Sequence, residues 1–521
     1  MPREIKLSLS PEEAFEDAKV LQQIALQLGL SAGRLNGFHR IRQSIDARRK
    51  QPLILLTVSA YVDEPFLFRK LTAFEWKDVT HAPHSALIIG CGPAGLFAAL
   101  RLIEKGIRPI LIERGKEVRA RRRDLARLNK EGIVNEDSNY CFGEGGAGTY
   151  SDGKLYTRSN KRGNLQRILD CFHHFGADEK ILYQSHPHIG TNKLPQIISA
   201  MRQHIEHHGG KVFFETRLTD LIIREGKATG IKTHRGDTIE ADAIVLATGH
   251  SARDIFQLLH QKNIYLEAKP FALGVRIEHP QSVIDQIQYH CPIRNPFLPP
   301  AAYSVVEQVN ARGVFSFCMC PGGIIAPAAT APGEVVVNGW SPSKRNNPFA
   351  NSGMVMSVEI PEISKYLNRA AHPLLMMEFQ QKIEQLAWKA GGGALCAPAQ
   401  RMMDFTQGKT SNNLPDCSYQ PGLQSVSLTD VLPPFIANGL REAFLRFGKK
   451  MKGYLTNEAV LVATESRTSS PVRIPRNSDT LQHEQINGLY PCGEGAGYAG
   501  GIISAAMDGE KVADAIALRL L

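Results

Sequence analysis

Two cysteines separated by one residue could carry out redox chemistry. Cys318 and Cys320 precede a proline and two glycines in a chain of 521 residues. Side chains two residues apart in an extended strand lie on one face with Cα atoms about 7 Å apart, too far for a relaxed disulfide. A bend at the Pro-Gly-Gly segment would bring the sulfur atoms together, and such a strained disulfide would be reduced easily. The pair therefore indicates redox or acid/base catalysis, or else two inert, buried small side chains.

Four further side chains could handle protons or anionic groups. His188 lies beside a glycine, and its imidazole could exchange a proton because it titrates near neutral pH. Arg276 and Arg467 could clamp an anionic substrate, since a guanidinium binds a carboxylate or phosphate through two hydrogen bonds. Lys154, which follows a glycine-rich loop, is a further candidate for the substrate side. Each of the four could equally be held by the backbone or by an internal ion pair.

The segment 85–115 predicts a dinucleotide site. An apolar strand runs into Gly90, Gly92 and Gly95, and an alanine-rich helix that begins with Pro93 and Ala94 follows. The first glycine permits a tight turn, the second lets the backbone approach a pyrophosphate, and the third lets the helix pack on the strand. The start of the helix offers free N–H groups to phosphates. A second strand closes on Glu113 and Arg114, about 20 residues further on, where a carboxylate can accept hydrogen bonds from ribose hydroxyls.

The carboxyl-terminal residues 488–509 indicate which dinucleotide binds. A short strand leads to Glu494, and a helix of small residues begins near Gly501. This arrangement resembles flavoproteins of the glutathione-reductase-like superfamily, in which the acid contacts the ribityl chain and the helix points at the flavin ring. A helix N-terminus stabilises the anionic reduced flavin by roughly 0.3–2 kcal/mol. The alternative is a Rossmann protein without flavin whose glycine-rich end is unrelated. From these segments and from the strand 243–246, we expect contacts to FAD from Ala247, Thr248, Gly249, Gly493, Glu494, Gly500, Gly501 and Ile502.

The glycine-rich loop 142–154 is a further candidate for flavin contact. Glycines allow backbone N–H groups to approach the ring where a side chain would block them. Gly145, Gly146 and Thr149 are the expected contacts in this loop. A purely structural turn is the alternative.

Several motifs together resemble a family of bacterial FAD-dependent dehydrogenases that are largely uncharacterised. The motifs extend over nearly the whole chain and are FGEGGAGTYSDGKLYTR (142–158), PHIGT (187–191), ALGVRIEHPQ (272–281), FSFCMCPGG (315–323), ESRTSSPVRI (465–474) and GEGAGYAGG (493–501). The resemblance implies a FAD oxidoreductase with non-covalent cofactor, and it does not indicate a substrate.

Composition narrows the remaining possibilities. The net charge of +10 comes partly from an arginine-rich helix at 113–131, which is either a solvated face or a surface for an anionic partner. That helix has no interleaved aromatic residues to stack bases, which disfavours nucleic acid. No apolar run reaches the roughly 18 residues that span a bilayer, and nine cysteines without paired spacing suggest free thiols in the cytoplasm. Because no partner cysteine pair completes four zinc ligands, we expect no metal.

We therefore predict an α/β chain of three parts. Residues 1–80 form a small α+β module that could be a ferredoxin-like appendage. Residues 81–255 together with 484–521 form a discontinuous Rossmann-type FAD domain. Residues 256–483 form a mixed α+β substrate domain. Because we expect no second Rossmann domain for NAD(P)H, this nucleotide would visit the substrate cleft transiently.

The expected activity is hydride transfer between a small molecule or NAD(P)H and the flavin N5. Two alternatives remain open on the sequence: a thiol/disulfide oxidoreductase that uses Cys318 and Cys320, and a flavin-bearing protein that modifies or binds RNA. The sequence gives no indication of the oligomeric state.

Overall fold

The computed structural model describes residues 2–157 and 163–521. Arg158, the last residue of the motif at 142–158, lies outside the described residues. Among the residues that are described, every helix is too short or too polar to span a bilayer.

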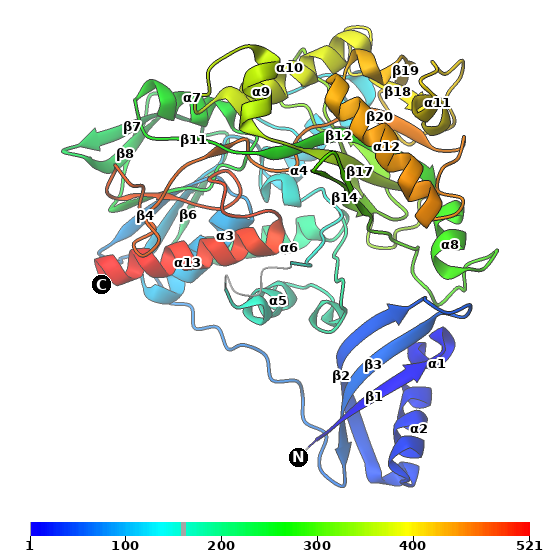
Figure 1. Ribbon diagram of the computed structural model, residues 1–521. Helices are drawn as coiled ribbons and strands as arrows, with labels where there is room; N and C mark the ends of the chain where they lie inside the picture. The colour runs from blue at the N-terminus through cyan, green and yellow to red at the C-terminus, as the bar shows by residue number, and fades with distance from the viewer. Residues whose placement is uncertain (1, 158–162) are drawn as a thin grey trace.

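A five-stranded parallel sheet forms the centre of one half of the molecule (Figure 1). Its order is β22-β10-β4-β5-β6, and each neighbouring pair is parallel. The strands are β4 (Ser85–Ile89), β5 (Arg108–Ile112), β6 (Lys211–Phe213), β10 (Ala243–Leu246) and β22 (Leu489–Pro491). Strands β10 and β22, 245 residues apart at the paired Ile244 and Leu489, thus lie side by side, and the carboxyl ends of all five strands meet at one edge.

Both faces of this sheet are covered, as parallel strands require. Alternate side chains such as Ile88 and Val245 pack with four helices, whereas Ile89 and Ile244 pack with an antiparallel meander and a fifth helix. The four helices are α3 (Pro93–Lys105), α5 (Leu165–His174), α6 (Leu194–His207) and α13 (Ile502–Leu520). The opposite face carries β7 (Leu218–Arg224), β8 (Lys227–Thr233), β9 (Thr238–Glu240) and α7 (Arg253–Gln261). The predicted meander in this region is confirmed.

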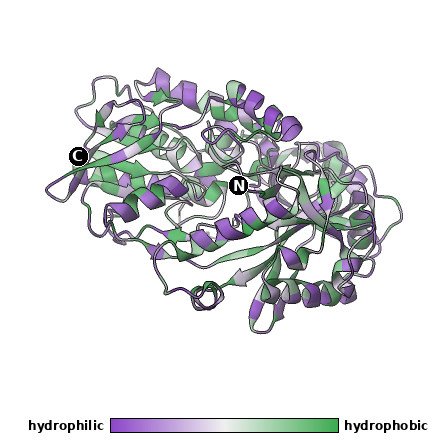
Figure 2. Cartoon of the chain, turned by 90° about the horizontal axis from the view of Figure 1, so that it is seen from above, coloured by the Kyte–Doolittle hydropathy of each residue, from purple (hydrophilic) through white to green (hydrophobic). Residues whose placement is uncertain are grey.

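A seven-stranded sheet forms the other half of the molecule. Its order is β13-β14-β17-β12-β20-β18-β19, mostly antiparallel, and its strands are largely hydrophobic while hydrophilic residues gather on peripheral helices (Figure 2). The strands are β12 (Phe271–Pro280), β13 (Val306–Val309), β14 (Arg312–Cys320), β17 (Phe349–Val358), β18 (Ala397–Arg401), β19 (Leu423–Ser425) and β20 (Val460–Glu465). Its helices are α8 (Gln281–Tyr289), α9 (Ile360–Leu367), α10 (Leu375–Ala390), α11 (Met402–Gln407) and α12 (Pro434–Lys450).

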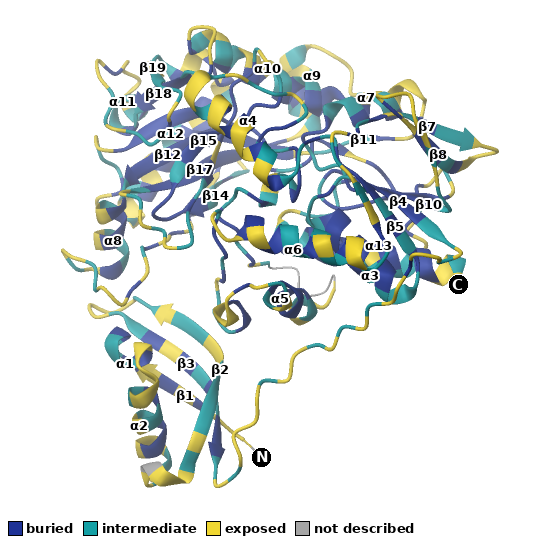
Figure 3. Cartoon of the chain, turned by 180° about the vertical axis from the view of Figure 1, so that it is seen from behind, coloured by how far each residue is buried: buried dark blue, intermediate teal, exposed yellow. Residues whose placement is uncertain are grey.

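Two short ribbons and one helix complete the larger part of the chain. The ribbons are β11 (Glu267–Ala268) with β21 (Val472–Arg473) and β15 (Ile324–Pro327) with β16 (Val337–Trp340). The arginine-rich helix is α4 (Val118–Glu131), whose outer face is exposed (Figure 3).

The N-terminal module is simpler than a ferredoxin-like fold. It consists of β1 (Arg3–Leu9), α1 (Pro11–Phe15), α2 (Asp17–Leu28), β2 (Leu35–Asp46) and β3 (Leu53–Val62), with strand order β1-β3-β2. The ferredoxin-like order βαββαβ needs a second helix and a fourth strand. Residues 63–84 form neither and instead run as an irregular linker to β4, which corrects the ferredoxin-like expectation (Figure 1). The strand β2, which follows the two helices of the module, pairs with β3 and carries basic side chains.

The close approach of α3 and α13 generates a test of this fold. A Cβ added at Gly509 on α13 would lie 2.1 Å from the Ala94 carbonyl oxygen on α3. In an ordinary helix a glycine-to-alanine change stabilises by about 1 kcal/mol. Here we expect Gly509→Ala to destabilise instead, by about 1–3 kcal/mol, because the two helices must separate. Chemical denaturation measures the difference.

The matched control is Gly313→Ala, whose added Cβ would meet its neighbours only at 3.6 Å or more. We expect its unfolding midpoint to stay close to that of the unchanged protein. A stabilised Gly509→Ala variant would show that α3 and α13 are not packed backbone to backbone.

Candidate active site

One cleft at the carboxyl edge of the parallel sheet brings together the segments that the sequence singled out. It extends from the turn after β4 to Phe317 and Cys318 on β14 of the other sheet. The predicted cofactor residues that line it are Gly90, Gly92, Pro93, Ala94, Glu113, Arg114, Gly146, Ala247, Thr248, Gly249, Glu494, Gly501 and Ile502.

The start of α3 leaves room for a pyrophosphate. Gly92 is the N-cap residue of α3, with φ −81° and ψ −175°. A Cβ added there would meet no protein atom closer than the Gly146 Cα at 3.9 Å. Gly249 and Gly501 are likewise open, with no atom within 4 Å of an added Cβ. The cradle therefore fits FAD, with glycines where the backbone must approach the cofactor.

Glu113 is fixed for a ribose contact by the backbone around it. Its two carboxylate oxygens accept hydrogen bonds of 2.9 Å from the N–H groups of Cys91, Gly115 and Gly143. An ionised carboxylate has about four lone-pair sites, so one remains for a ligand hydroxyl. Glu494 also lines the cleft, and burial, against the opposing charge of Lys269, raises its pKa to about 7.

Five predicted cofactor residues do not line the cleft, so their direct contact with FAD stays a prediction. They are Gly95, Gly145, Thr149, Gly493 and Gly500. Gly95 allows close packing, because an added Cβ would lie 2.0 Å from the Gly90 carbonyl oxygen. Gly145 and Gly493 have positive φ, and the Thr149 hydroxyl donates to the Glu144 carbonyl at 2.7 Å. These residues shape the turns around the site.

Lys154 lies between the two cysteines of β14. Its Nζ is 3.8 Å from the Cys318 Sγ and 3.7 Å from the Cys320 Sγ, and it also donates to the Met319 carbonyl. Asp152 lies 3.6 Å from the same Nζ. Burial disfavours the ammonium, but the two sulfur atoms and the carboxylate outweigh it and raise the pKa of Lys154 to about 12. Lys154 is therefore a permanent cation in the cleft.

The backbone at Cys318 departs from a regular strand. The β14–β17 register shifts between Phe317 and Cys320, and Cys318 has a φ of 47°. A left-handed residue within a bulge re-aims the side chains on either side of it. Cys318 consequently lines the cleft, whereas Cys320 is fully buried behind it. All nine cysteines are free thiols in the structure, including Cys318 and Cys320.

The two sulfur atoms have opposite proton affinities. A hydrogen bond from Cys320 lowers the pKa of Cys318 well below its usual value, although burial opposes this shift. The charges of Lys154 and Arg276 lower the pKa further. The same hydrogen bond, together with burial, raises the pKa of Cys320 well above the ordinary value. The pair thus holds one proton, with the negative charge on the sulfur that faces the cleft.

His188 and Arg276 are positioning residues and do not line the cleft. The His188 Nε2 contacts the Ser343 carbonyl at 3.1 Å, and burial, aided by Arg345, lowers the pKa of His188 to about 4. The fully buried Arg276 donates to Glu465 at 2.8 Å and to the Cys318 carbonyl at 3.3 Å. This placement corrects the expectation that His188 exchanges protons and that Arg276 clamps a substrate. Arg276 instead anchors the bulge that carries Cys318.

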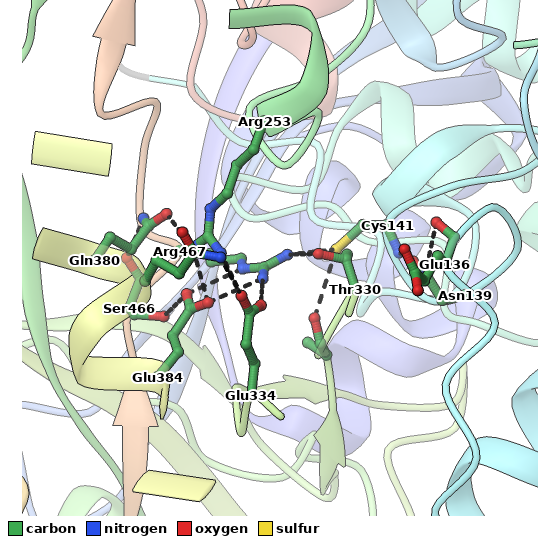
Figure 4. Close-up of polar contacts among 12 residues, drawn as sticks. Glu136, Asn139, Cys141, Arg253, Thr330, Glu334, Gln380, Glu384, Ser466 and Arg467 are labelled. Atoms are coloured by element: carbon green, nitrogen blue, oxygen red, sulfur yellow. Dashed lines mark hydrogen bonds and ion pairs between the residues drawn. The ribbon is translucent and has the colours of Figure 1, made fainter. Parts of the chain in front are cut away.

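Arg467 reaches the cleft, but its guanidinium is already occupied (Figure 4). It donates to Glu384 at 3.1 Å and to Glu334 at 3.2 Å, and Arg253 bonds the same two carboxylates. Against burial, the two arginines lower the pKa of Glu384 to about 2. The network balances two arginines with two carboxylates, and the Arg467 guanidinium is held by Glu384 and Glu334, so the expected role of Arg467 as a substrate clamp is corrected to a structural one.

Sequence reasoning missed the partners of these cations. Arg345 bonds Asp152 at 2.6 Å, and the two carboxylates that bind Arg467, with the Arg253 that shares them, come from elsewhere in the chain. Glu334, Glu384 and Arg253 lie outside the quoted motifs, and no local spacing relates them to Arg467. These residues come together only in the folded structure, so the sequence alone does not reveal the network.

Comparisons with known proteins place the chain in a family. An uncharacterized protein of Clostridium beijerinckii is 39% identical over 523 residues, which cover 96% of each chain. Residues 270–468 match a family described as FAD-dependent protein, C-terminal domain-like, and residues 188–303 match FAD dependent oxidoreductase. Residues 1–61 match a domain of unknown function. The chain belongs to this family of uncharacterised FAD-dependent oxidoreductases, and its cofactor is FAD.

More distant similarities have lower sequence identity. Protein FixC of Escherichia coli K12 is 27% identical over 205 residues, which cover 38% of this chain and 44% of FixC. Among solved structures, a glycine oxidase from Bacillus cereus is 14% identical, with a TM-score of 0.30 over 84% of this chain and 96% of its own. The comparisons favour an oxidoreductase over the thiol/disulfide and RNA alternatives.

The open space at Gly92 generates a prediction about cofactor binding. We expect Gly92→Val to fold normally, since the protein itself leaves room for the side chain. The side chain would occupy the phosphate space, so FAD binding should weaken at least about tenfold, or about 1.4 kcal/mol. Flavin absorbance per mole of purified protein, with the circular dichroism spectrum, measures both effects. Gly33→Val, at an equally open position outside the cleft, is the control, and full flavin content in Gly92→Val would contradict the placement.

The occupied guanidinium of Arg467 generates a stability prediction. Arg467→Met leaves two buried carboxylates with one arginine, which should cost about 3 kcal/mol in the free energy of unfolding. Urea denaturation measures this loss. The control is Arg224→Met, whose partner Glu240 is half exposed and whose loss should cost less than about 1 kcal/mol. A variant of Arg467 with unchanged stability but lost turnover would restore the substrate-clamp role.

Proposed function

We propose that this protein transfers a hydride between its FAD and a small molecule that enters the cleft from the side of the seven-stranded sheet. FAD binding is assigned to residues 81–255 with 484–521, and the substrate contacts to residues 256–483. One observation carries the proposal: a single cleft is lined both by Gly92 and Glu494 and by Phe317, Cys318 and Asn338 of the other half. A substrate seated against these last residues would lie within the same space as the cofactor.

The residues at the substrate end suit a reaction that moves charge. FAD supplies the redox chemistry by accepting or giving a hydride. Lys154 offers a permanent ammonium and Cys318 a thiolate, so a cation and a proton acceptor stand side by side at the cleft. Asp152 and Arg345 behind them restrict the lysine to one orientation. Such preorganised groups stabilise developing charge without reorganising during the reaction.

A nicotinamide nucleotide is our proposed electron donor, bound transiently in the same cleft. The GxGxxG turn after β4 lines the FAD cradle, and the same spacing at 143–148 and 495–500 lies at or next to that cradle, so none of the three marks a second nucleotide site. A nucleotide donor would therefore share the substrate space.

We also place the protein in a reducing compartment, the cytoplasm. Its nine cysteines are free thiols, and four of them are buried. Free thiols in such number are typical of proteins kept reduced.

Anaerobic stopped-flow absorbance tests the electron donor. We expect NADH or NADPH to bleach the flavin band of the purified protein rapidly, because the cleft admits a second ligand beside the cofactor. Dithionite gives the fully reduced reference spectrum. If dithionite bleaches the band and neither nucleotide does, the nucleotide proposal fails and the small molecule becomes the electron donor.

A further inference from the structure

The thiol pair of β14 has an arrangement that the transfer of a hydride does not require. Two sulfur atoms contact one ammonium at 3.8 and 3.7 Å, but only Cys318 borders the cleft. Cys320 has no exposed surface and donates through its thiol to the Cys318 carbonyl at 3.3 Å. A reactive sulfur at the cleft thus has a protonated, shielded sulfur directly behind it.

The bulge is what brings the sulfur atoms to the same cation. Regular pleating would separate the two Cα atoms by about 7 Å with both side chains on one face. The left-handed backbone at Cys318 interrupts that pleating, and Arg276 holds its carbonyl in place. Both sulfur atoms therefore lie within 3.8 Å of the same ammonium, one at the cleft and the other behind it.

We propose that Cys318 is a site of oxidation by hydrogen peroxide and that Cys320 is its resolving thiol. In the first step the Cys318 thiolate attacks one peroxide oxygen, the O–O bond breaks, and sulfenic acid and hydroxide form. In the second step the Cys320 thiol attacks the Cys318 sulfur, an S–S bond forms, and water leaves. Peroxide accepts the two electrons, and two equivalents of a small thiol return the pair to its reduced state as they form a disulfide of their own.

The ion pair explains why this sulfur, among nine, would react. The thiolate is the nucleophile, and an ordinary cysteine of pKa about 8.5 is only about 3% thiolate at neutral pH. Lys154 and Arg276 are the cations that favour the thiolate of Cys318. By contrast, burial raises the pKa of Cys396, a partly exposed thiol that lacks a cationic partner among its contacts. Oxidation would replace the negative sulfur at the cleft by a neutral disulfide and leave Asp152, 3.6 Å away, as the remaining anionic partner of Lys154.

Peptide mass spectrometry of the holoenzyme tests the site directly. The reduced protein is treated with one equivalent of hydrogen peroxide in the presence of dimedone, which traps sulfenic acid. We expect the unchanged protein to form a Cys318–Cys320 disulfide, and Cys320→Ser to accumulate the dimedone adduct on Cys318. Cys396→Ser is the matched control and should behave as the unchanged protein. Oxidation of Cys318 no faster than Cys396, or equal adduct formation with and without Cys320, would overturn the proposal.

The dependence on Lys154 provides a second readout. At about pH 7 we expect Lys154→Met to slow the oxidation of Cys318 about tenfold. Without the ammonium the thiolate fraction of Cys318 falls, and the accompanying rise in the nucleophilicity of that thiolate offsets only part of the loss. The rate in Lys154→Met should climb between about pH 6 and 8, whereas that of the unchanged protein should stay flat. Lys154→Arg should restore most of the rate. A pH-dependent rate in the unchanged protein would refute the ion pair even if a variant failed to fold.

Discussion

The parallel alignment of β22, β10, β4 and β5 is the constraint on which the site depends. Because these strands run in one direction, the loops that follow them meet at one edge. The loops then pack backbone against backbone: a Cβ at Gly90 would lie 2.4 Å from the Ala247 carbonyl oxygen, and one at Gly495 would lie 2.6 Å from that of Gly249. Glycine at these positions is therefore needed to bring three distant segments around one cofactor.

The second sheet depends on this edge for its own function. Its strand β14 would be an ordinary edge-proximal strand without the bulge at Cys318, and its side chains would alternate regularly. The bulge turns one thiol towards the cleft, and Lys154, from the loop between α4 and α5, meets it there. Arg276 on β12 ties the bulge to Glu465 on β20, so three strands of the second sheet hold the cysteine at the cofactor site.

Local patterns in the sequence predicted the elements and the cofactor cradle well. The Gly90–Gly95 turn, the C-terminal helix and the meander are each encoded by residues close together in the chain, and spacing alone identifies them. The failures concern residues whose role is set by distant partners. Arg276 and Arg467 were expected at a substrate because arginine suits that task, yet Glu465 and Glu384, 189 and 83 residues away, neutralise them.

Two cationic centres border the same cleft, and the chemistry of their counterions separates them. The guanidinium of Arg467 is balanced by carboxylates, which neither change oxidation state nor exchange a proton near neutral pH when their pKa is depressed, as for Glu384. The ammonium of Lys154 is balanced largely by sulfur, which is polarizable, nucleophilic and open to oxidation. A structural ion pair requires only charge, and a carboxylate supplies it with less reactivity. The second centre instead uses thiols, and the left-handed backbone at one of them turns its sulfur into the cleft. We therefore infer that the chemically reactive side of the cleft is the side that carries Lys154.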